Sequence, residues 1–405
     1  MTKTEIFKKI IKTDFNFSGR VCIDSRMLEK GDIFIAIRNG NNFVNTAIQK
    51  GCFPIYDNGK YEVGLKVDDS SEFIKQFARE YREYLDATVI GITGSNGKTT
   101  VKDVLAHLLD NSYKTEGNHN NLIGEPLTIL NCPITSKYLV LEMGMSKLGE
   151  IDELASIAKP DYSIITNIGD SHLEFLKTRE NVFHAKCEII KHTKYMTIVN
   201  GEDEFLSTLD KPNVIKVKLD KYTPNDIYTH FVFKGMTYET NLHGKHNAQD
   251  ICLTLEVLEQ MNVKLDEDKL KDIKITDMRF QIIKKNGNIY INDAYNAAPK
   301  SVESSLLTLN ELFKNKKKYL VLGDMLELGE NEIKYHEDLK YVLDKIDYEK
   351  VYLYGKLMSH LNADRCIHTM DKEEIKKDLD KLCDVVIFLK GSRGMKLEEI
   401  IGSDK

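Results

Sequence analysis

The sequence has no long apolar run, no strong excess of charge and no cysteine motif, and each absence narrows the possible functions. No stretch approaches the ~18 consecutive apolar residues of a membrane helix, so we expect no membrane span. The 57 Lys and Arg residues nearly balance the 63 Asp and Glu residues and lie scattered along the chain, which argues against nucleic acid as a partner. The seven cysteines contain no C-x-x-C pair, so they indicate cytosolic thiols and neither disulfides nor zinc.

What the chain does have is length and a repeated alternation of strand and helix patterns. Its 405 residues exceed one ordinary domain. The pattern predicts an α/β protein with a small unit at 1–84, a central parallel-sheet unit at 85–277 and a Rossmann-like unit at 278–405. The last unit lacks G-x-G-x-x-G after any strand, so dinucleotide binding is not indicated. We expect a cytoplasmic protein that is a monomer.

The stretch 89–100 is the strongest functional signal. An apolar strand turns through glycines into a Gly-Lys-Thr-Thr sequence that opens a helix. Such glycines let successive N–H groups converge on one anion, while Lys98 adds a positive charge and Thr99 a hydroxyl for Mg²⁺. Ile92 stands where the general phosphate-loop pattern has its first glycine, so an ordinary helix-capping turn is the alternative; the strand–turn–helix context favours a triphosphate site. The predicted nucleotide-binding residues of the loop are Gly94, Ser95, Asn96, Gly97, Lys98, Thr99 and Thr100.

Polar residues also follow two later apolar strands. Glu142 ends the predicted strand 138–142, and His172 comes shortly after the strand pattern of 162–169. Because ligands of open parallel sheets gather at the carboxyl ends of the strands, Glu142 is a candidate Mg²⁺ ligand, although a strand-end acid can also cap a helix. The amides Asn120 and Asn121, which lie between the glycine loop and Glu142 in the sequence, suit a loop beside a ligand.

Two further positions have ordinary alternatives. Ser25 and Arg26 could bind an anion or a sugar, but a solvated turn with an Asp24–Arg26 ion pair is the favoured alternative. Lys186 lies in a predicted helix at 181–190 among apolar neighbours, where a lysine by default extends its ammonium group to water.

Taken in order, these motifs resemble the Mur ligases of cell-wall precursor synthesis nearly from end to end. Two of them, 295–296 and 323–329, look specific to the branch that adds D-alanyl-D-alanine to a UDP-linked muramoyl tripeptide. The motifs that carry the resemblance are 24–26, 93–99, 120–128, 142–144, 166–169 with His172, 185–188, Gly244 with 246–247, 293–296, 322–329 and 390–393.

The resemblance implies an N-terminal domain for the UDP-linked substrate, a central ATPase domain with the phosphate loop, and a Rossmann-like C-terminal domain that closes on ATP and brings the incoming amine. It implies a reaction in which ATP converts a carboxylate into an acyl phosphate, which the amine attacks to give an amide, ADP and phosphate. The enzyme must then neutralise many negative oxygens at one edge of the sheet.

The resemblance also assigns metal and catalytic roles. Lys98 would hold the β- and γ-phosphates, and Thr99 and Glu142 would hold one Mg²⁺. His172 and a carbamylated Lys186 would hold or support a second Mg²⁺ beside the acyl phosphate. Carbamylation turns the amine into a carboxylate-like group, which would explain a lysine close to a metal.

For the nucleotide, the resemblance implies that Asn247 contacts adenine, Arg279 a phosphate and Asp293 the ribose, with Tyr295 next to adenine or ribose. For the substrate it implies contacts from Ser25, Arg26, Asn120 and Asn121.

Two departures from the family pattern leave the substrate open. The chain has 40–42 where the family usually has a longer Asp-Gly-His segment, and Met278 replaces the usual glycine before the arginine. Another amino acid or peptide on a related carrier, as in archaeal pseudomurein ligases, is therefore an alternative. A P-loop phosphotransferase or ATPase is an alternative of another class, but it would not need Lys186 after His172. A nucleotide sensor without catalysis is disfavoured because every matched phosphate and metal position is filled.

Overall fold

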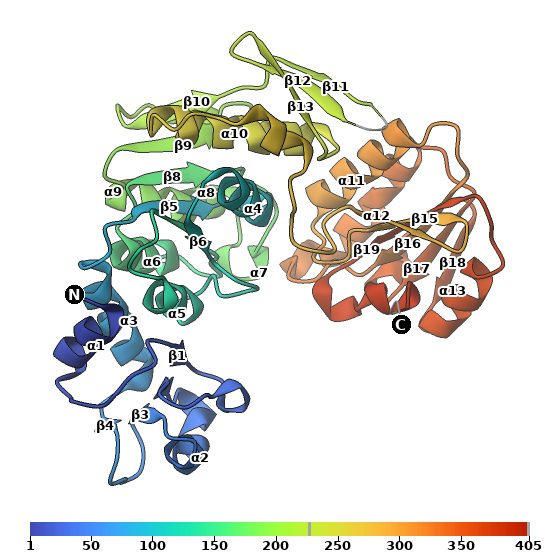
Figure 1. The fold of residues 1–405 in the computed structure, drawn as a ribbon. Coiled ribbons are helices and arrows are strands. Elements are labelled where there is room, and N and C mark those ends of the chain that lie inside the picture. The colour runs from blue at the N-terminus through green and yellow to red at the C-terminus, as the bar shows by residue number, and fades with distance from the viewer. Residues whose placement is uncertain (226–227, 403–405) are drawn as a thin grey trace.

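The computed structural model describes residues 1–225 and 228–402, which form three α/β domains, as the sequence predicted. The central domain, green in Figure 1, adjoins both the blue N-terminal domain and the red C-terminal domain. In the described part of the chain, no helix combines the length and the apolar character that crossing a membrane would require.

The N-terminal domain is built on a four-stranded parallel sheet in the order β1-β2-β3-β4. Strands β2 and β3 are buried throughout, as expected for the apolar middle of a parallel sheet. Its elements are α1 (Lys3–Ile11), β1 (Val21–Cys22), the 3-10 turn η1 (Ser25–Met27), β2 (Ile33–Ile35), the 3-10 turn η2 (Arg38–Phe43), α2 (Val44–Gln49), β3 (Phe53–Tyr56), β4 (Leu65–Lys66) and α3 (Ser70–Arg82).

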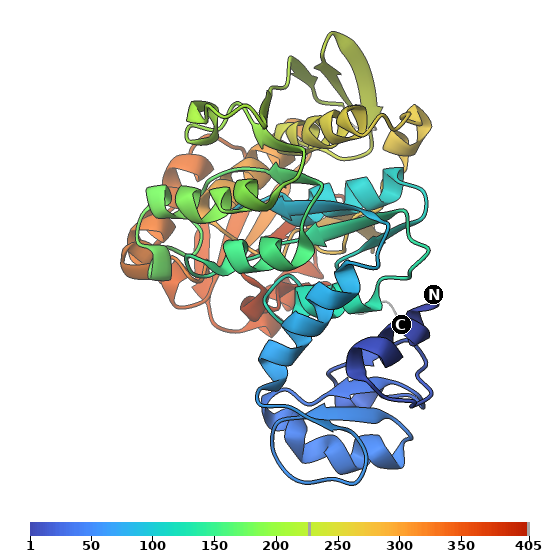
Figure 2. The ribbon, with the colours of Figure 1, turned by 90° about the vertical axis from the view of Figure 1, so that its left-hand side faces the viewer.

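Helix α3 joins the N-terminal domain to the central one, and Figure 2 shows it as the light-blue helix that runs from one to the other. Tyr81 Oη donates to the carbonyl of Cys132 at 2.9 Å, and Arg82 Nε donates to the carbonyl of Ala158 at 2.8 Å. Apolar residues of α1 and α3 belong to the same buried cluster as residues of the central sheet. The N-terminal domain is thus fixed to its neighbour by a continuous core.

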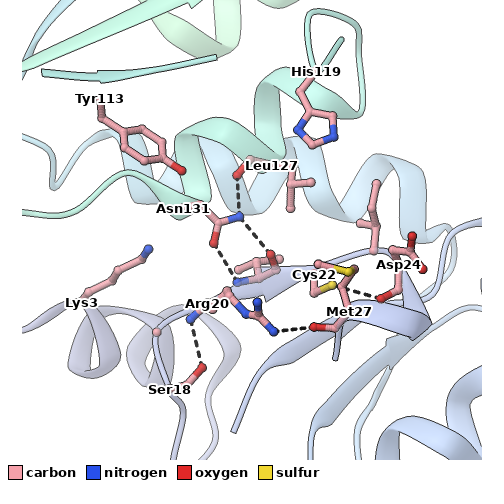
Figure 3. Close-up of a pocket in the computed structure, with 13 residues that line it drawn as sticks. Lys3, Ser18, Arg20, Cys22, Asp24, Met27, Tyr113, His119, Leu127 and Asn131 are labelled. Carbon is pink, nitrogen blue, oxygen red and sulfur yellow. Dashed lines mark hydrogen bonds between the residues drawn. The ribbon is translucent and has the colours of Figure 1, made fainter. Parts of the chain in front are cut away.

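An asparagine closes the free edge of the N-terminal sheet. The Asn131 amide, from the end of α5 (Gly124–Asn131), donates to the Val21 carbonyl at 2.9 Å and accepts from the Val21 N–H at 3.0 Å, as a neighbouring strand would (Figure 3). A second donation, to the Leu127 carbonyl at 3.0 Å, holds the side chain in place. This contact covers an edge that would otherwise leave backbone groups unpaired.

The central domain contains a six-stranded parallel sheet in the order β10-β9-β8-β5-β7-β6, with β5 in its interior. The apolar run of β5 is buried almost throughout, so its carboxyl end brings the glycine loop to the middle of the sheet edge. The first half comprises β5 (Thr88–Thr93), α4 (Lys98–Leu108), β6 (Ser112–Lys114), α5 (Gly124–Asn131), β7 (Tyr138–Glu142), α6 (Glu150–Ala158) and β8 (Tyr162–Ile165).

The second half of the central domain adds short helices, the remaining strands and a separate antiparallel sheet in the order β11-β12-β13. Its elements are α7 (Leu173–Leu176), α8 (Arg179–Cys187), α9 (Ile189–His192), β9 (Met196–Asn200), β10 (Val214–Val217), β11 (Lys221–Thr223), β12 (Thr229–Phe233), β13 (Met236–Thr240) and α10 (Lys245–Gln260).

The C-terminal domain has a six-stranded sheet in the order β14-β15-β19-β16-β17-β18. All neighbours are parallel except β14, which forms an antiparallel hairpin with β15. The predicted parallel alternation is therefore confirmed apart from this edge. The elements are β14 (Gln281–Lys285), β15 (Asn288–Asn292), α11 (Pro299–Leu312), β16 (Lys318–Gly323), α12 (Glu332–Leu343), β17 (Lys350–Tyr354), β18 (Cys366–Thr369), α13 (Lys372–Leu379) and β19 (Val386–Lys390).

Candidate active site

A cavity of about 1410 Å³ is lined by residues of all three domains. It is larger than an ordinary single-ligand pocket, so it has room for a nucleotide and a second substrate. Of the predicted site residues, Gly94, Ser25, Arg26 and Lys186 do not line it. The predicted residues that do line it are Ser95, Asn96, Gly97, Lys98, Thr99, Thr100, Asn120, Asn121, Glu142, His172, Asn247, Arg279, Asp293 and Tyr295.

The glycine loop leaves β5 and enters α4 through two residues with positive φ, Gly94 at 151° and Gly97 at 83°. A side chain at Gly94 would collide with Thr166, and a Cβ at Gly97 would lie 2.5 Å from the carboxylate of Asp250. Lys98 Nζ donates to the Gly94 carbonyl at 2.7 Å, and burial lowers the pKa of this lysine. The loop therefore has the glycine-dependent shape and the cation that a phosphate requires.

Glu142 is held at the end of β7 by bonds to both of its oxygens. Thr99 Oγ1 donates to Oε2 at 2.9 Å, and Asn120 Nδ2 donates to Oε1 at 2.9 Å. The side chain is almost fully buried yet lines the cavity. Thr99 and Glu142, the two residues predicted to hold one Mg²⁺, therefore lie next to each other, and Asn120 is bonded to the same carboxylate.

Arg279 links the C-terminal domain to the phosphate loop. Its Nη2 donates to Thr99 Oγ1 at 3.1 Å, and its guanidinium lies 4.2 Å from the centre of the Tyr295 ring. Both neighbours of Arg279 have positive φ, Met278 at 63° and Phe280 at 51°. Only glycine adopts such a φ without strain, which explains why glycine suits position 278 and why Met278 is strained there.

The strained linker is fixed to the central domain through Asp103. Asp103 Oδ2 accepts from the N–H and from the hydroxyl of Thr276, both at 2.7 Å, while Oδ1 accepts from Lys114 Nζ at 2.7 Å. These bonds, together with the Lys102 ammonium, hold the pKa of Asp103 below its ordinary value despite burial. Asp103 thus positions the segment that carries Arg279.

Asp293 is already bonded on both oxygens. Oδ2 accepts from Lys390 Nζ and from Ser305 Oγ, each at 2.6 Å, and Oδ1 accepts from the Phe280 N–H at 3.2 Å. Burial lowers the pKa of Lys390, and the Asp293 carboxylate opposes that effect. A ribose hydroxyl would have to join this network through the remaining lone pairs.

His172 connects the central and C-terminal domains. Its Nδ1 lies 3.3 Å from Glu327 Oε2, and this contact lowers the pKa of the Glu327 carboxyl. Nearby, Tyr335 Oη donates to Asp170 Oδ1 at 3.4 Å. The structure therefore places His172 where the two domains meet over the cavity.

Lys186, on α8, is 1% exposed, so the interpretation that its ammonium reaches water is wrong. Burial holds its pKa well below the ordinary value, and the charge of Lys98 lowers it further. Within the described residues its ammonium makes no hydrogen bond and no ion pair. Glu188, two residues later in the sequence, caps α6 by accepting from the N–H groups of Gly149 at 2.8 Å and Asp152 at 3.0 Å. Lys186 is a buried amine without a counter-ion.

Arg26 forms the ion pair that the alternative interpretation expected, 2.6 Å from Asp24, and its side chain is 86% exposed. Asp24 lines a smaller cavity of about 600 Å³ against α5, shown in Figure 3, whereas Ser25 and Arg26 line neither cavity. The substrate role of these two residues stays a prediction.

Sequence reasoning missed Asp250, which lines the cavity and touches the glycine loop. Burial raises the pKa of Asp250 to about 8, and nearby Arg279 only partly offsets this effect. It lies three residues after Asn247 on α10, so the helical period could have placed both on one face. His246, on the same helix, is half-buried, and desolvation lowers its pKa to about 4.

The fold and the site define a three-domain P-loop ligase, and the sequence matches agree. Residues 92–258 match the Mur ligase middle domain, and residues 278–393 match the family model described as Mur ligase, glutamate ligase domain. The chain is 36% identical to the UDP-N-acetylmuramoyl-tripeptide–D-alanyl-D-alanine ligase of Bacillus subtilis (strain 168), over 94% of this chain and 92% of that protein. The chain belongs to the Mur ligase family.

Solved structures point to one branch of the family. The MurF ligase from Thermotoga maritima in complex with ADP superposes with a TM-score of 0.85 at 29% identity, covering 96% of this chain and 97% of that one. MurF from Acinetobacter baumannii gives a TM-score of 0.88 at 25% identity, with 98% and 97% coverage. A pseudomurein peptide ligase type C from Methanothermus fervidus gives 0.64 at 16% identity, over 91% and 93% of the chains, which shows a shared fold alone.

Proposed function

We propose that this chain is an ATP-dependent, ADP-forming ligase that joins D-alanyl-D-alanine to a UDP-N-acetylmuramoyl tripeptide. The observation that carries the proposal is that the phosphate loop, Glu142, Arg279 and a wall of the N-terminal domain all face one cavity. The relatives that match over nearly the whole chain are named for this reaction. ATP and a UDP-linked precursor are cytoplasmic metabolites, so we expect the reaction to take place there.

In this proposal the loop and Lys98 bind the β- and γ-phosphates of ATP. Lys98 Nζ exchanges its bond to the Gly94 carbonyl for phosphate oxygens, and the α4 N-terminus adds its unpaired N–H groups. Arg279 donates to a phosphate from the opposite wall. Asn247 contacts the adenine, and Tyr295 lies next to the adenine or the ribose. Asp293 accepts a hydrogen bond from a ribose hydroxyl.

The residues present fit Mg²⁺. Among the residues that the structure describes, no three or more His, Cys, Asp and Glu side chains are grouped to hold a metal ion. Mg²⁺ does not need such a group, because phosphate oxygens and water complete its shell around one or two protein ligands. Thr99 Oγ1 and Glu142, 2.9 Å apart beside the loop, would hold one ion and His172 would support a second. Bound Mg²⁺ would neutralise charge on the transferring phosphoryl group.

Carbamylation of Lys186 fits the surroundings of its side chain, which is buried outside the lining of the cavity and interacts with the charge of Lys98. Burial is the main reason why the pKa of Lys186 is low, and the charge of Lys98 lowers it further; among the described residues the ammonium group has no acceptor. A lysine with a lowered pKa carries the neutral amine that reacts with CO₂, and the product is an anion. The modification would therefore replace the repulsion between the two ammonium groups of Lys98 and Lys186 with an attraction between Lys98 and the carbamate.

The chemistry then balances without any further reactant. A carboxylate oxygen of the tripeptide attacks the γ-phosphorus, the bond from the γ-phosphorus to the bridging oxygen breaks, and ADP leaves. The free amine of D-alanyl-D-alanine attacks the carbonyl of the acyl phosphate, loses a proton and expels inorganic phosphate. Lys98 and Arg279 stabilise the charge that develops on the phosphoryl oxygens.

Phosphate release tests the proposal against its alternatives. Purified enzyme is given ATP, Mg²⁺ and a panel of UDP-linked peptides and amines. We expect release only when a UDP-linked tripeptide ending in a diamino acid and D-alanyl-D-alanine are both present. Release with a single amino acid would shift the chain to another ligase specificity, and release with ATP alone would favour a phosphotransferase or ATPase.

A further inference from the structure

The N-terminal domain contributes three described residues to the wall of the large cavity, Ile23, Ile37 and Arg38. Of these, Arg38 is the only one with a charge. A UDP-linked acceptor carries two negative charges on its diphosphate, and the N-terminal wall must neutralise them if the peptide end is to reach the phosphate loop. We propose that Arg38 binds the diphosphate of the acceptor, an assignment that rests on the proposed function.

Arg38 is available for this contact, unlike the two arginines that precede it. Within the described part of the chain its guanidinium makes no hydrogen bond, ion pair or ring contact, and the residue is exposed. Arg20 is bonded to Asp32 at 2.5 Å, and Arg26 is paired with Asp24 at 2.6 Å. A carboxylate already neutralises each of those, so a diphosphate would gain less from either.

The backbone at Arg38 is rigid and strained. The residue follows the buried strand β2 and opens η2 with φ 52°. The left-handed region costs a non-glycine residue roughly 1–2 kcal/mol. Asn41 holds the turn, because its Nδ2 donates to the Arg38 carbonyl at 3.0 Å and to Asp57 Oδ1 at 2.7 Å. Such strain persists at ligand-binding positions, where a fixed backbone aims a side chain.

The position of Arg38 suits the diphosphate of the acceptor. β2 is an interior strand of a parallel sheet, and its carboxyl end, where Arg38 lies, is the edge at which ligands gather. The amides Asn120 and Asn121 line the cavity from the central domain, toward Glu142. An acceptor bound by Arg38 would thus extend past these amides to the ATP site. A planar guanidinium can bind two phosphate oxygens at once, which an ammonium cannot.

The test uses Arg38→Ala, Arg38→Lys and Arg38→Gly in the full-length enzyme. We expect Arg38→Ala to raise the KM for the UDP-tripeptide about tenfold or more, as for a lost charged hydrogen bond, with the KM for ATP and kcat within twofold. Arg38→Lys should fall between Ala and wild type. Arg38→Gly should show the same KM defect with a Tm no lower than wild type, because glycine relieves the strained φ. A purely structural role would move Tm and KM together.

Arg365 provides a matched control. It is another exposed arginine with positive φ, 53°, and it lies in the C-terminal domain outside the large cavity. Arg365→Gly should relieve the same kind of strain, although it also removes the contact of the Arg365 guanidinium with the Tyr348 ring, 4.8 Å away, and it should leave every KM unchanged. Arg26→Ala separates the two candidate arginines, since a larger KM defect there than in Arg38→Ala would overturn the assignment.

Calorimetric titration with UDP separates this proposal from the proposed function. Wild type should bind UDP, and Arg38→Ala should bind it about tenfold or more weakly, with a smaller dependence on salt. Equal affinity of the two proteins, or no binding by wild type, would overturn the role of Arg38. Failure of wild type to release phosphate with the substrate panel, while UDP binding still depends on Arg38, would contradict the proposed reaction alone.

Discussion

Glu125 should make the protein less stable as the pH rises. Replacing its carboxyl group with an amide should abolish this contribution to the pH dependence of stability. It lies in the first turn of α5 and is fully buried, and neither of its carboxylate oxygens has a hydrogen-bond partner among the residues that the structure describes. The helix N-terminus offers little help, because Asn121 Oδ1 already accepts from the N–H groups of Ile123 and Gly124. Burial therefore raises the pKa of Glu125 well above its ordinary value of 4.5.

The size of the effect follows from proton linkage. Below pH 4.5 the carboxyl is protonated in both the folded and the unfolded chain, so its burial carries no ionisation cost. Above that pH the unfolded chain releases the proton and the folded chain keeps it, so the free energy of unfolding falls by about 1.4 kcal/mol for each pH unit up to the raised pKa. Between pH 5 and pH 7 the loss reaches up to about 2.5 kcal/mol.

Urea unfolding followed by circular dichroism at pH 5, 6 and 7 measures this, and it suits a chain without tryptophan. Glu125→Gln has no proton to keep, so its stability relative to wild type should increase with pH by the amounts above. Glu337→Gln, at an exposed position of α12, is the control and should run parallel to wild type. Parallel curves for wild type and Glu125→Gln would show that Glu125 does not keep its proton in the folded chain.

Two further predictions concern the active site. Lys186→Ala should be nearly inactive in the phosphate-release assay, and acetate, but not chloride, should partly restore it by filling the position of the carbamate; turnover at the wild-type rate would contradict the modified lysine. Thr276→Val removes one hydroxyl bond to Asp103, worth about 0.5–1.5 kcal/mol, so the KM for ATP should rise by roughly twofold to tenfold through Arg279 with little change in Tm. An unchanged KM for ATP would show that Asp103 does not position the linker.

Local sequence patterns predicted the elements that carry the nucleotide site. The apolar run before the glycine loop forms β5, and the predicted strand at 138–142 coincides with β7. Both are interior strands of a parallel sheet. Such strands are buried on both faces, so they appear in the sequence as continuous apolar runs that can be recognised without the structure. Short edge elements such as β14 were missed because two-sided exposure leaves no clear pattern in a hairpin.

Contacts between distant segments could not be predicted from the residues alone. Arg26 stood out in the sequence because it belongs to the Asp-Ser-Arg motif, yet Asp24 of that motif neutralises its charge. Arg38 belongs to no such motif, and only the folded structure shows that it lines the cavity. The interpretation that the Lys186 ammonium group extends to water was wrong because a helical sequence pattern does not show whether the rest of the protein covers the side chain. Asp103 and Thr276 lie far apart in the chain, so their bond has no sequence signal.

In the proposed mechanism, the phosphoryl group of ATP passes to a carboxylate of the acceptor before the amide forms. The direct test uses a UDP-tripeptide with ¹⁸O in the reacting carboxylate, together with ATP and D-alanyl-D-alanine, and mass analysis of the released phosphate. We expect one ¹⁸O atom in each phosphate, because the acyl phosphate gives up its carboxylate oxygen with the leaving group. Unlabelled phosphate, or label recovered in AMP, would contradict this mechanism.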